Sequence, residues 1–315
     1  HGDPAAAAAT VDWAAEAKDA VGAGYTSFKL KPRPWFDIVA QVDAISKVVP
    51  PHFKLDLDPN QTWQNAATAI PIIKKLEKYP IVAMYESPIP QNDILGNRQI
   101  RRATSRPVAM HFGSPPYITC VREEVVDGFV LCAGKSTVVR QGILSAEAQM
   151  PFWLQLVGNG LTTTWAAHLG AVLSNATWPA ITCGNLNSHQ LLKKPIEVVG
   201  GYHQVPQGPG LGVEVDEKAI KRFQVPEKAI KKFRDQGLPF NAPLPRIINC
   251  VVYPGNACVY MASTSQGYGY FGGGNGPAYA EGVRMEPWAD DGSKQWAELF
   301  ARAQKQPVRA RWQVR

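Results

Sequence analysis

Short apolar runs that alternate with amphipathic segments constrain the fold of this chain more than any other feature. Seven runs have the composition of strands: 25–31, 53–58, 81–86, 107–111, 127–132, 152–157 and 179–183. Strands of a parallel sheet alternate in this way with the helices that cover the sheet. The spacing therefore predicts an α/β fold of the (β/α) TIM-barrel type.

Helix-like segments lie before and between these runs, with apolar residues at helical spacing. They are 11–21, 36–48, 62–79, 93–104, 117–124, 137–149 and 161–174. Pro71 is expected to interrupt the third of them. Because the series opens on a helix, the first strand of a closed eight-stranded barrel is absent from it. Either the opening HGDP segment forms a remnant of that strand, or the chain is a fragment or a processed piece.

The alternating pattern ends after residue 185. Residues 215–223 (VDEKAIKRF) are nearly repeated at 225–233 (VPEKAIKKF), which predicts two short basic amphipathic helices rather than a repeat fold. The remainder is rich in Gly and Pro, and its Gly cluster lacks the strand–loop–helix context of a phosphate loop. We expect a barrel domain over 1–223 and an irregular C-terminal extension over 224–315, of unknown role, that wraps the barrel or contacts a partner.

Composition and charge argue against several classes of protein. Hydrophobic residues make up 45% of the 315 residues, and the formal net charge is +7. This charge is compatible with anionic small substrates, but no long basic run appears, so we expect no nucleic-acid partner. No run approaches the ~20 apolar residues of a membrane span, and the start lacks the features of a signal peptide. We expect a cytoplasmic protein without membrane contact.

The five cysteines match no zinc or disulfide framework, and their number is odd. Cys132 and Cys183 lie in apolar runs, so buried, inert thiols are predicted there. Cys250 and Cys258 could pair, although reduced thiols are the rule in a cytosolic protein.

Polar residues stand where successive strand-like runs end. Lys29 and Lys31 end the first run, Asp58 and Asn60 end the second, and Glu86 ends the third. The carboxyl ends of barrel strands meet at one face, where such groups can support metal-assisted proton transfer. Simpler interpretations remain open: Asp58 caps the following helix, Glu86 pairs with a lysine, and the lysines only close a strand.

Several motifs in register resemble the barrel domain of the enolase superfamily, in its mandelate racemase/muconate lactonizing branch. They are Gly24-Tyr25 before FKLK, the K-x-K itself, LDLDPNQTW, YESPIP, RPVAM and GGYHQVPQGPGLGVEVDE at 200–217. The resemblance covers about residues 11–223. It implies an enolase-type barrel, and it implies that the α/β cap domain which precedes the barrel in that family is absent from this chain.

The resemblance also implies a chemistry, the removal of a proton beside a carboxylate. A divalent cation, Mg²⁺, neutralises the enediolate that develops, and a lysine takes the proton. Asp58 and Glu86 would be metal ligands. The family places a further acid where this chain has His111, which is a possible ligand although Mg²⁺ prefers oxygen. An ordinary histidine at a strand end is the alternative.

Catalytic and substrate-binding roles follow from the same resemblance. Lys31 would be the base, and Lys29 would tune its pKa or steer the substrate carboxylate. Asn60 would support the metal loop and bind substrate. Gln155, which stands where racemase-like members place a histidine, would bind and orient substrate. Cycloisomerase-like members place a lysine near Cys132. A two-base racemase is therefore disfavoured, while one-base dehydration of an acid sugar or cycloisomerisation stays open.

The sequence therefore predicts a metal-dependent lyase or isomerase that acts on a small carboxylate through an enediolate. The alternative is a catalytically degenerate member that acts as a binding or structural protein. We expect a homo-oligomer. We also expect the cap to come from a separate polypeptide, from a missing N-terminal portion, or from the tail after residue 234.

Overall fold

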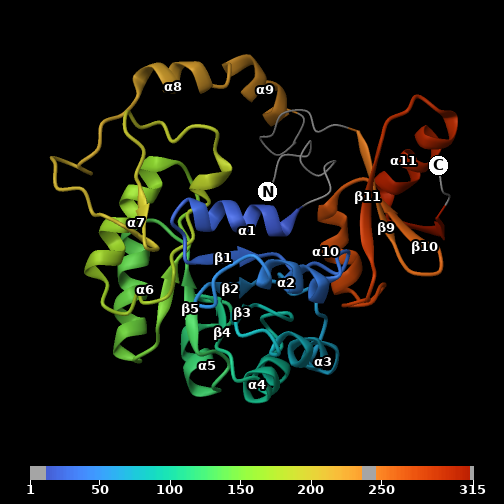
Figure 1. Cartoon of the computed structure of the whole chain (residues 1–315), viewed down its shortest axis with the longest axis horizontal. Coiled ribbons are helices and arrows are strands. Elements are labelled where there is room, and N and C mark those ends of the chain that lie inside the picture. The colour runs from blue at the N-terminus through green and yellow to red at the C-terminus, as the bar shows by residue number, and fades with distance from the viewer. Residues whose placement is uncertain (1–11, 236–245, 313–315) are drawn as a thin grey trace.

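An open sheet of six parallel strands, covered by helices, forms the larger part of the protein (Figure 1). The computed structural model describes residues 12–235 and 246–312. Consecutive strands are neighbours, in the order β1-β2-β3-β4-β5-β6. The strands are β1 (Ser27–Leu30), β2 (Lys54–Leu57), β3 (Val82–Glu86), β4 (Val108–His111), β5 (Gly128–Leu131) and β6 (Phe152–Leu154). The helices are α1 (Trp13–Gly22), α2 (Ile38–Ser46), α3 (Ala66–Leu76), α4 (Ile94–Ala103), α5 (Tyr117–Arg122), α6 (Lys135–Glu147) and α7 (Gly160–Val172).

The predicted barrel is confirmed as a curled half-barrel. The seventh predicted strand is reduced to one parallel bridge between Gln155 and Ile181. The predicted interruption at Pro71 is wrong, because α3 runs through this residue. Ala69, Ile72 and Leu76 of α3 are buried, and this packing outweighs the one backbone hydrogen bond that proline cannot make.

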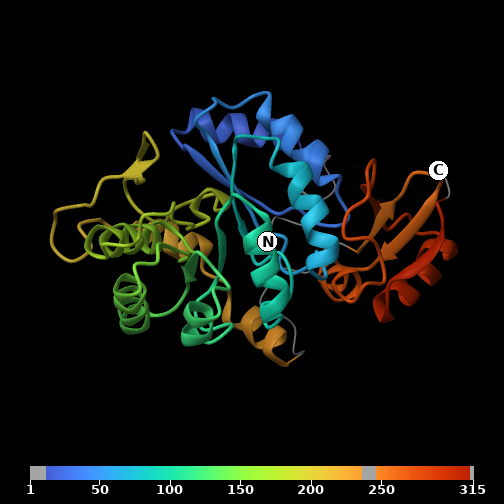
Figure 2. The ribbon, with the colours of Figure 1, turned by 90° about the horizontal axis from the view of Figure 1, so that it is seen from below.

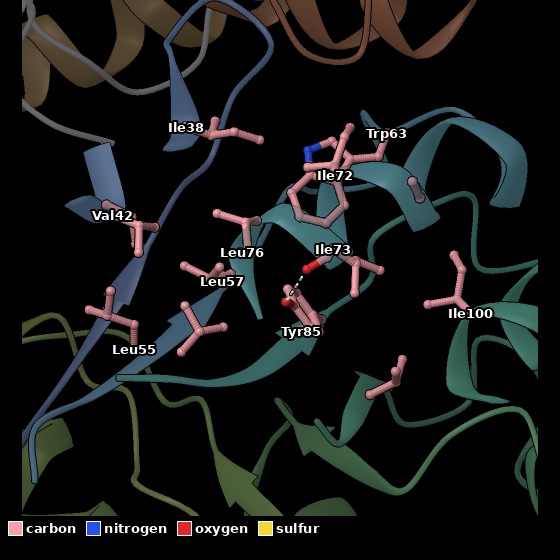
Figure 3. Close-up of a cluster of buried hydrophobic side chains, with 14 of the residues drawn as sticks. Ile38, Val42, Leu55, Leu57, Trp63, Ile72, Ile73, Leu76, Tyr85 and Ile100 are labelled. Carbon is pink, nitrogen blue, oxygen red and sulfur yellow. Dashed lines mark hydrogen bonds between the residues drawn. The ribbon is translucent and has the colours of Figure 1, made fainter. Parts of the chain in front are cut away.

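The two faces of the sheet differ in chemistry because successive side chains of a strand point to opposite sides. Leu55, Leu57 and Tyr85 point outward and join one apolar cluster with residues of α2 and α3, as Figure 3 shows. The Tyr85 hydroxyl donates to the Ile73 carbonyl oxygen at 3.4 Å. Burying a side chain of this size contributes about 1.5–3 kcal/mol. The outer face thus holds the helices, and the inner face carries the polar residues that end the strands.

Residues 184–235 return across the parallel sheet and begin with a 3-10 turn, η2 (Gly184–Leu186). The hairpin of β7 (Val198–Val199) and β8 (Tyr202–His203) lies against the entrance to β1, where the Gly201 amide donates to the Gly24 carbonyl oxygen at 2.9 Å. The two predicted basic helices are confirmed as α8 (Glu217–Phe223) and α9 (Glu227–Asp235). The HGDP segment, the suggested remnant of a first strand, lies outside the described residues.

The C-terminal region is more regular than its Gly- and Pro-rich composition predicts. It forms an antiparallel sheet in the order β11-β9-β10-β12 with two helices, which we call the C-terminal unit (residues 247–311). Its elements are β9 (Ile247–Val252), β10 (Ala257–Met261), α10 (Thr264–Gly272), β11 (Arg284–Ala289), α11 (Lys294–Lys305) and β12 (Val308–Arg311). All six residues of β9 are buried, so this strand is covered on both faces.

The C-terminal unit lies beside the parallel sheet rather than on top of its helices (Figures 1 and 2). One face of its sheet packs on α11 through Trp296, which is fully buried. The other face packs on α10 and on Trp35, which follows β1 of the half-barrel. The Trp35 ring lies 5.8 Å from the Phe271 ring of α10. This shared apolar cluster joins the two parts of the chain.

Within the described residues, none of the helices has both the length and the apolar character that a membrane crossing requires.

Two glycines of α10 allow a matched test of this junction. A Cβ atom at Gly267 would lie 2.5 Å from the Trp35 ring, whereas a Cβ atom at Gly269 meets nothing within 4 Å. We expect Gly267→Ala to destabilise the protein by about 1–3 kcal/mol through overpacking. Gly269→Ala should stabilise it by up to about 1 kcal/mol, because alanine is the better helix former. Urea unfolding of both variants measures this, and equal effects would contradict the described junction.

Candidate active site

The predicted site residues converge at the edge of the sheet where the parallel strands end. Lys29 and Lys31 belong to the end of β1, Asp58 directly follows β2, and Glu86 is the last residue of β3. Along each strand they alternate with Leu30, Leu57 and Tyr85, which point to the outer face, so the site residues point to the inner face. The carboxyl ends of parallel strands meet at one edge, so residues distant in sequence become neighbours.

Lys29 lies at the centre of the site, with only 9% of its side chain exposed. Its Nζ donates to Glu86 Oε2 and, at 2.8 Å, to Gln155 Oε1. The same Nζ lies 3.2 Å from Asp58 Oδ2 and 5.6 Å from the centre of the Trp153 ring. The carboxylates of Asp58 and Glu86 therefore share one ammonium group, which places both within reach of a single cation.

The charges of this cluster shift one another's pKa values. Burial alone would lower the pKa of Lys29, but the carboxylates of Asp58, Glu86 and Asp56 outweigh burial and raise the pKa. Burial works against the charged form of Asp58, yet Lys29 and Lys31 lower the pKa of this carboxyl. Burial, together with the charge of Glu86, raises the pKa of Asp56 well above its usual range. Asp58 is thus held ionised, while Asp56 favours its proton.

Lys31 lies at the mouth of the site and is 45% exposed. Its Nζ donates to Asp58 Oδ2 and, at 3.0 Å, to Asn60 Oδ1. The Asn60 backbone N–H in turn donates to Asp58 Oδ1 at 2.9 Å. Asp58 therefore caps its own turn and not the following helix, whose N-cap is Asn65.

Two residues of the site had no predicted role. Arg33 is buried, and its guanidinium donates to the Asp58 carbonyl oxygen at 3.1 Å and to Asn60 Oδ1 at 2.5 Å. Asp56 pairs in register with Lys29 of the neighbouring strand. The sequence did carry a signal for both. Lysine, lysine and arginine recur at every second residue from 29 to 33, and two aspartates recur at 56 and 58.

His111, the last residue of β4, faces Glu86, with its Nε2 3.3 Å from Glu86 Oε1. This carboxylate oxygen is buried and accepts no hydrogen bond, which suits an atom that could bind a cation. No three His, Cys, Asp or Glu side chains of residues 12–235 and 246–312 are grouped as a ready metal site. Two carboxylates nevertheless suffice for Mg²⁺, which commonly keeps several waters.

All seven predicted site residues belong to one contact network. His111 lies beside Glu86, and Lys29 joins Glu86 to Gln155 and Asp58. Lys31 joins Asp58 to Asn60. Their catalytic, substrate-binding and ligand roles stay predictions.

On the opposite side of the mouth, Gln155 and Cys132 occupy the positions where the family resemblance implies a second basic residue. Gln155 follows β6 and is engaged by Lys29. Cys132 follows β5 and is exposed, and Cys183 is half-buried, so the prediction of buried thiols at these positions is wrong. Strand β5 ends at the mouth one residue before Cys132, so Leu131 is buried while Cys132 is exposed.

Comparisons with known proteins match the fold and part of the sequence. Residues 12–219 match a family model described as "Enolase C-terminal domain-like". The chain is 28% identical over 198 residues to Muconate cycloisomerase 1-1 of Acinetobacter lwoffii, covering 59% of this chain and 50% of that protein. A mandelate racemase/muconate lactonizing family protein from Azoarcus sp. EbN1 superposes with a TM-score of 0.58 and 22% identity, covering 69% of this chain and 64% of that one.

A dipeptide epimerase from Cytophaga hutchinsonii, crystallised with Mg and the dipeptide D-Ala-L-Val, superposes with a TM-score of 0.57. It is 22% identical, and the match covers 66% of this chain and 59% of the epimerase. This chain spans about half the length of the curated relatives it matches. At these identities the solved structures establish likeness of fold.

The two lysines of β1 provide a matched test of the charge cluster. Lys29→Met should destabilise the fold by about 3–5 kcal/mol, because it leaves the buried Glu86 carboxylate without its ammonium partner. Lys31→Met should cost about 0–1 kcal/mol, because Lys31 is largely solvated. Urea unfolding at pH 7 measures both variants.

The raised pKa of Lys29 determines the pH at which its contribution to stability is measured. A lysine whose pKa is raised by folding contributes stability that is fully present below its usual value of 10.5 and is lost only as the pH rises through the folded value. The full effect of Lys29 is therefore present at pH 7. Equal destabilisation by the two variants would contradict the central place of Lys29.

Proposed function

This chain belongs to the enolase C-terminal domain-like family, as a barrel of the mandelate racemase/muconate lactonizing type, and from that premise we propose that it is a metal-dependent lyase or isomerase. The reaction removes the proton on the carbon next to the carboxylate of a small acid. One observation carries the proposal: Lys31 stands at the open mouth and contacts Asp58, one of the two acids that the Lys29 ammonium draws together. The candidate base therefore lies next to the candidate cation-binding pair.

Asp58 and Glu86 would hold the metal ion, for which we propose Mg²⁺. A bound divalent cation draws negative charge from a substrate carboxylate and so makes the neighbouring C–H more acidic. Glu86 Oε1 is buried and accepts no hydrogen bond, so it has capacity for a cation. His111 would be a further ligand. Lys29 already neutralises both acids, so we expect metal binding to compete with its ion pairs.

The two lysines suit different tasks. Lys31 is exposed at the mouth, where a substrate carbon can approach its Nζ, and we assign it the role of base. Lys29 is buried, and its raised pKa keeps it protonated at neutral pH, so it suits the attraction of a substrate carboxylate. The amide oxygens of Asn60 and Gln155 already accept from these lysines, and we propose that their NH₂ groups donate to the substrate.

The opposite side of the site limits the reaction to one base. Gln155 and Cys132 stand at the positions where a second basic residue was sought. A neutral amide transfers no proton, and Gln155 is bound to Lys29. Dehydration of an acid sugar and cycloisomerisation each proceed with one base, and we propose these two classes. The homo-oligomer and the cytoplasmic location stay predictions.

A second candidate function is binding without turnover. The specific observation in its favour is the charge balance of the site, in which Lys29 already contacts both acids while His111 replaces the further acid. Such a site would take up a small carboxylate between Lys29 and Lys31 without chemistry.

Metal binding tests the ligand assignment. Titration calorimetry with Mg²⁺ should detect one site, and Asp58→Asn or Glu86→Gln should weaken binding at least about tenfold, because each removes a charged oxygen donor. Asp127→Asn is the matched control, since this carboxylate directly precedes β5 at the other end of the sheet. Unchanged affinity in Asp58→Asn and Glu86→Gln would exclude these residues as ligands.

Solvent deuterium incorporation tests the base. With a panel of α-hydroxy acids, Lys31→Ala should slow exchange at the α-carbon at least about 100-fold, while Mg²⁺ affinity stays close to that of the unmodified protein. Lys47→Ala removes an exposed lysine of α2 and should change neither quantity. Exchange that persists in Lys31→Ala contradicts its role. Binding of Mg²⁺ and acid with no exchange in the unmodified protein favours the binding candidate.

A further inference from the structure

The C-terminal unit contacts two of the loops at the mouth, those after β1 and β2. The ring of Tyr268, on α10, lies 4.7 Å from the guanidinium carbon of Arg33 in the loop after β1. Gln64, in the loop after β2, donates through Nε2 to the carbonyl oxygens of Phe271 at 2.9 Å and Gly276 at 2.7 Å. The unit therefore makes polar as well as apolar contact with the edge of the mouth.

The loop after β2, residues 58–65, is strained and needs such support. We call it the acid loop because it begins with Asp58. Asn60, Gln61 and Gln64 have φ values of 49°, 67° and 69°, in the left-handed region that residues with a Cβ atom rarely occupy. Such conformations persist only where the surroundings impose them.

Contacts from three sides impose this shape. The Gln61 amide donates to the Ser87 carbonyl oxygen at 2.8 Å, and the Trp63 amide donates to the Pro88 carbonyl oxygen at 3.1 Å. These two bonds tie the acid loop to the segment that follows Glu86. Arg33 supports the start of the loop through Asp58 and Asn60, and the C-terminal unit supports its end through Gln64.

Tyr268 extends the reach of the C-terminal unit to the start of the loop. Arg33 is only 5% exposed although it carries a charge. Its guanidinium plane lies over the tyrosine ring while its NH groups donate to the acid loop. A cation over an aromatic face is attracted more strongly when water is excluded. The ring thus covers the side of Arg33 that would otherwise be solvated, and it orients the hydrogen bonds to Asp58 and Asn60.

We propose that the C-terminal unit completes the active site by holding the acid loop in the shape that points Asp58 toward Glu86, and that Tyr268 is the positioning residue acting through Arg33. The proposal rests on the proposed function in one respect, the role of Asp58 as a ligand. The unit supports the loops of the mouth on the side of β1 and β2. The C-terminal unit begins more than 170 residues after the acid loop, and it therefore controls the geometry of the acid pair from a distant part of the chain.

Hydrogen exchange of the full chain without metal tests the positioning directly. In Tyr268→Ala, the amides of residues 60–63 should exchange about tenfold faster, the change that corresponds to loss of a partly desolvated cation–π contact. Tyr268→Phe keeps the ring and should restore slow exchange. Tyr270→Ala is the matched control, because Tyr270 lies on the same helix but contacts Arg309 within the C-terminal unit. Unchanged exchange in Tyr268→Ala, or equal acceleration in Tyr270→Ala, would overturn the proposal.

A second variant keeps the test valid if Tyr268→Ala unfolds. Gln64→Leu removes both bonds to the C-terminal unit without altering α10, and it should accelerate exchange in the acid loop alone. Titration of the same variants with Mg²⁺ should show about a tenfold weaker affinity in Tyr268→Ala and recovery in Tyr268→Phe. If the unmodified protein binds no Mg²⁺, the proposed function fails, while the exchange data still decide whether the unit holds the loop.

Discussion

The ammonium group of Lys29, held between the carboxylates of Asp58 and Glu86, is the interaction on which the inner face of the half-barrel depends. Two buried carboxylates that face each other without a cation would repel, and each would lose its hydration. Lys29 offsets both costs, and its Nζ lies 5.6 Å from the centre of the Trp153 ring. The same charge balance keeps Asp58 ionised and leaves Asp56 to favour its proton.

This charged centre is compatible with a stable fold because the two faces of the sheet have separate tasks. The outer residues of β2 and β3 pack with α2, α3 and α4 in one apolar cluster, so the packing of the helices does not depend on the charged residues of the inner face. The period of two along each strand produces this separation. A change of register by one residue would bring Lys29 and Asp58 into the apolar layer, where their charges could not be balanced.

The candidate site has the two acids and two lysines that the family resemblance implies, and it departs from the implied pattern at three positions. His111 stands where a further acid was expected, and Cys132 and Gln155 stand where a second base was sought. These departures are the reason that the proposed function is limited to one-base reactions or to binding without turnover. The C-terminal unit lies outside residues 12–219, which match the family model, and it reaches the mouth through Trp35, Gln64 and the pair of Tyr268 and Arg33.

The sequence by itself determined the six strands, the helices between them and the seven residues that meet at the mouth. The strands and helices follow from a period of two and a helical period, and Lys29, Lys31, Asp58, Asn60 and Glu86 follow from polar positions at the ends of apolar runs. His111 and Gln155 follow only from the family resemblance. Only the tertiary structure decided that the seventh strand shrinks to one bridge, that Cys132 is exposed, and that Tyr268 covers Arg33. These features depend on tertiary contacts such as that between Tyr268 and Arg33, whose free energy depends on packing, a property that no local pattern encodes.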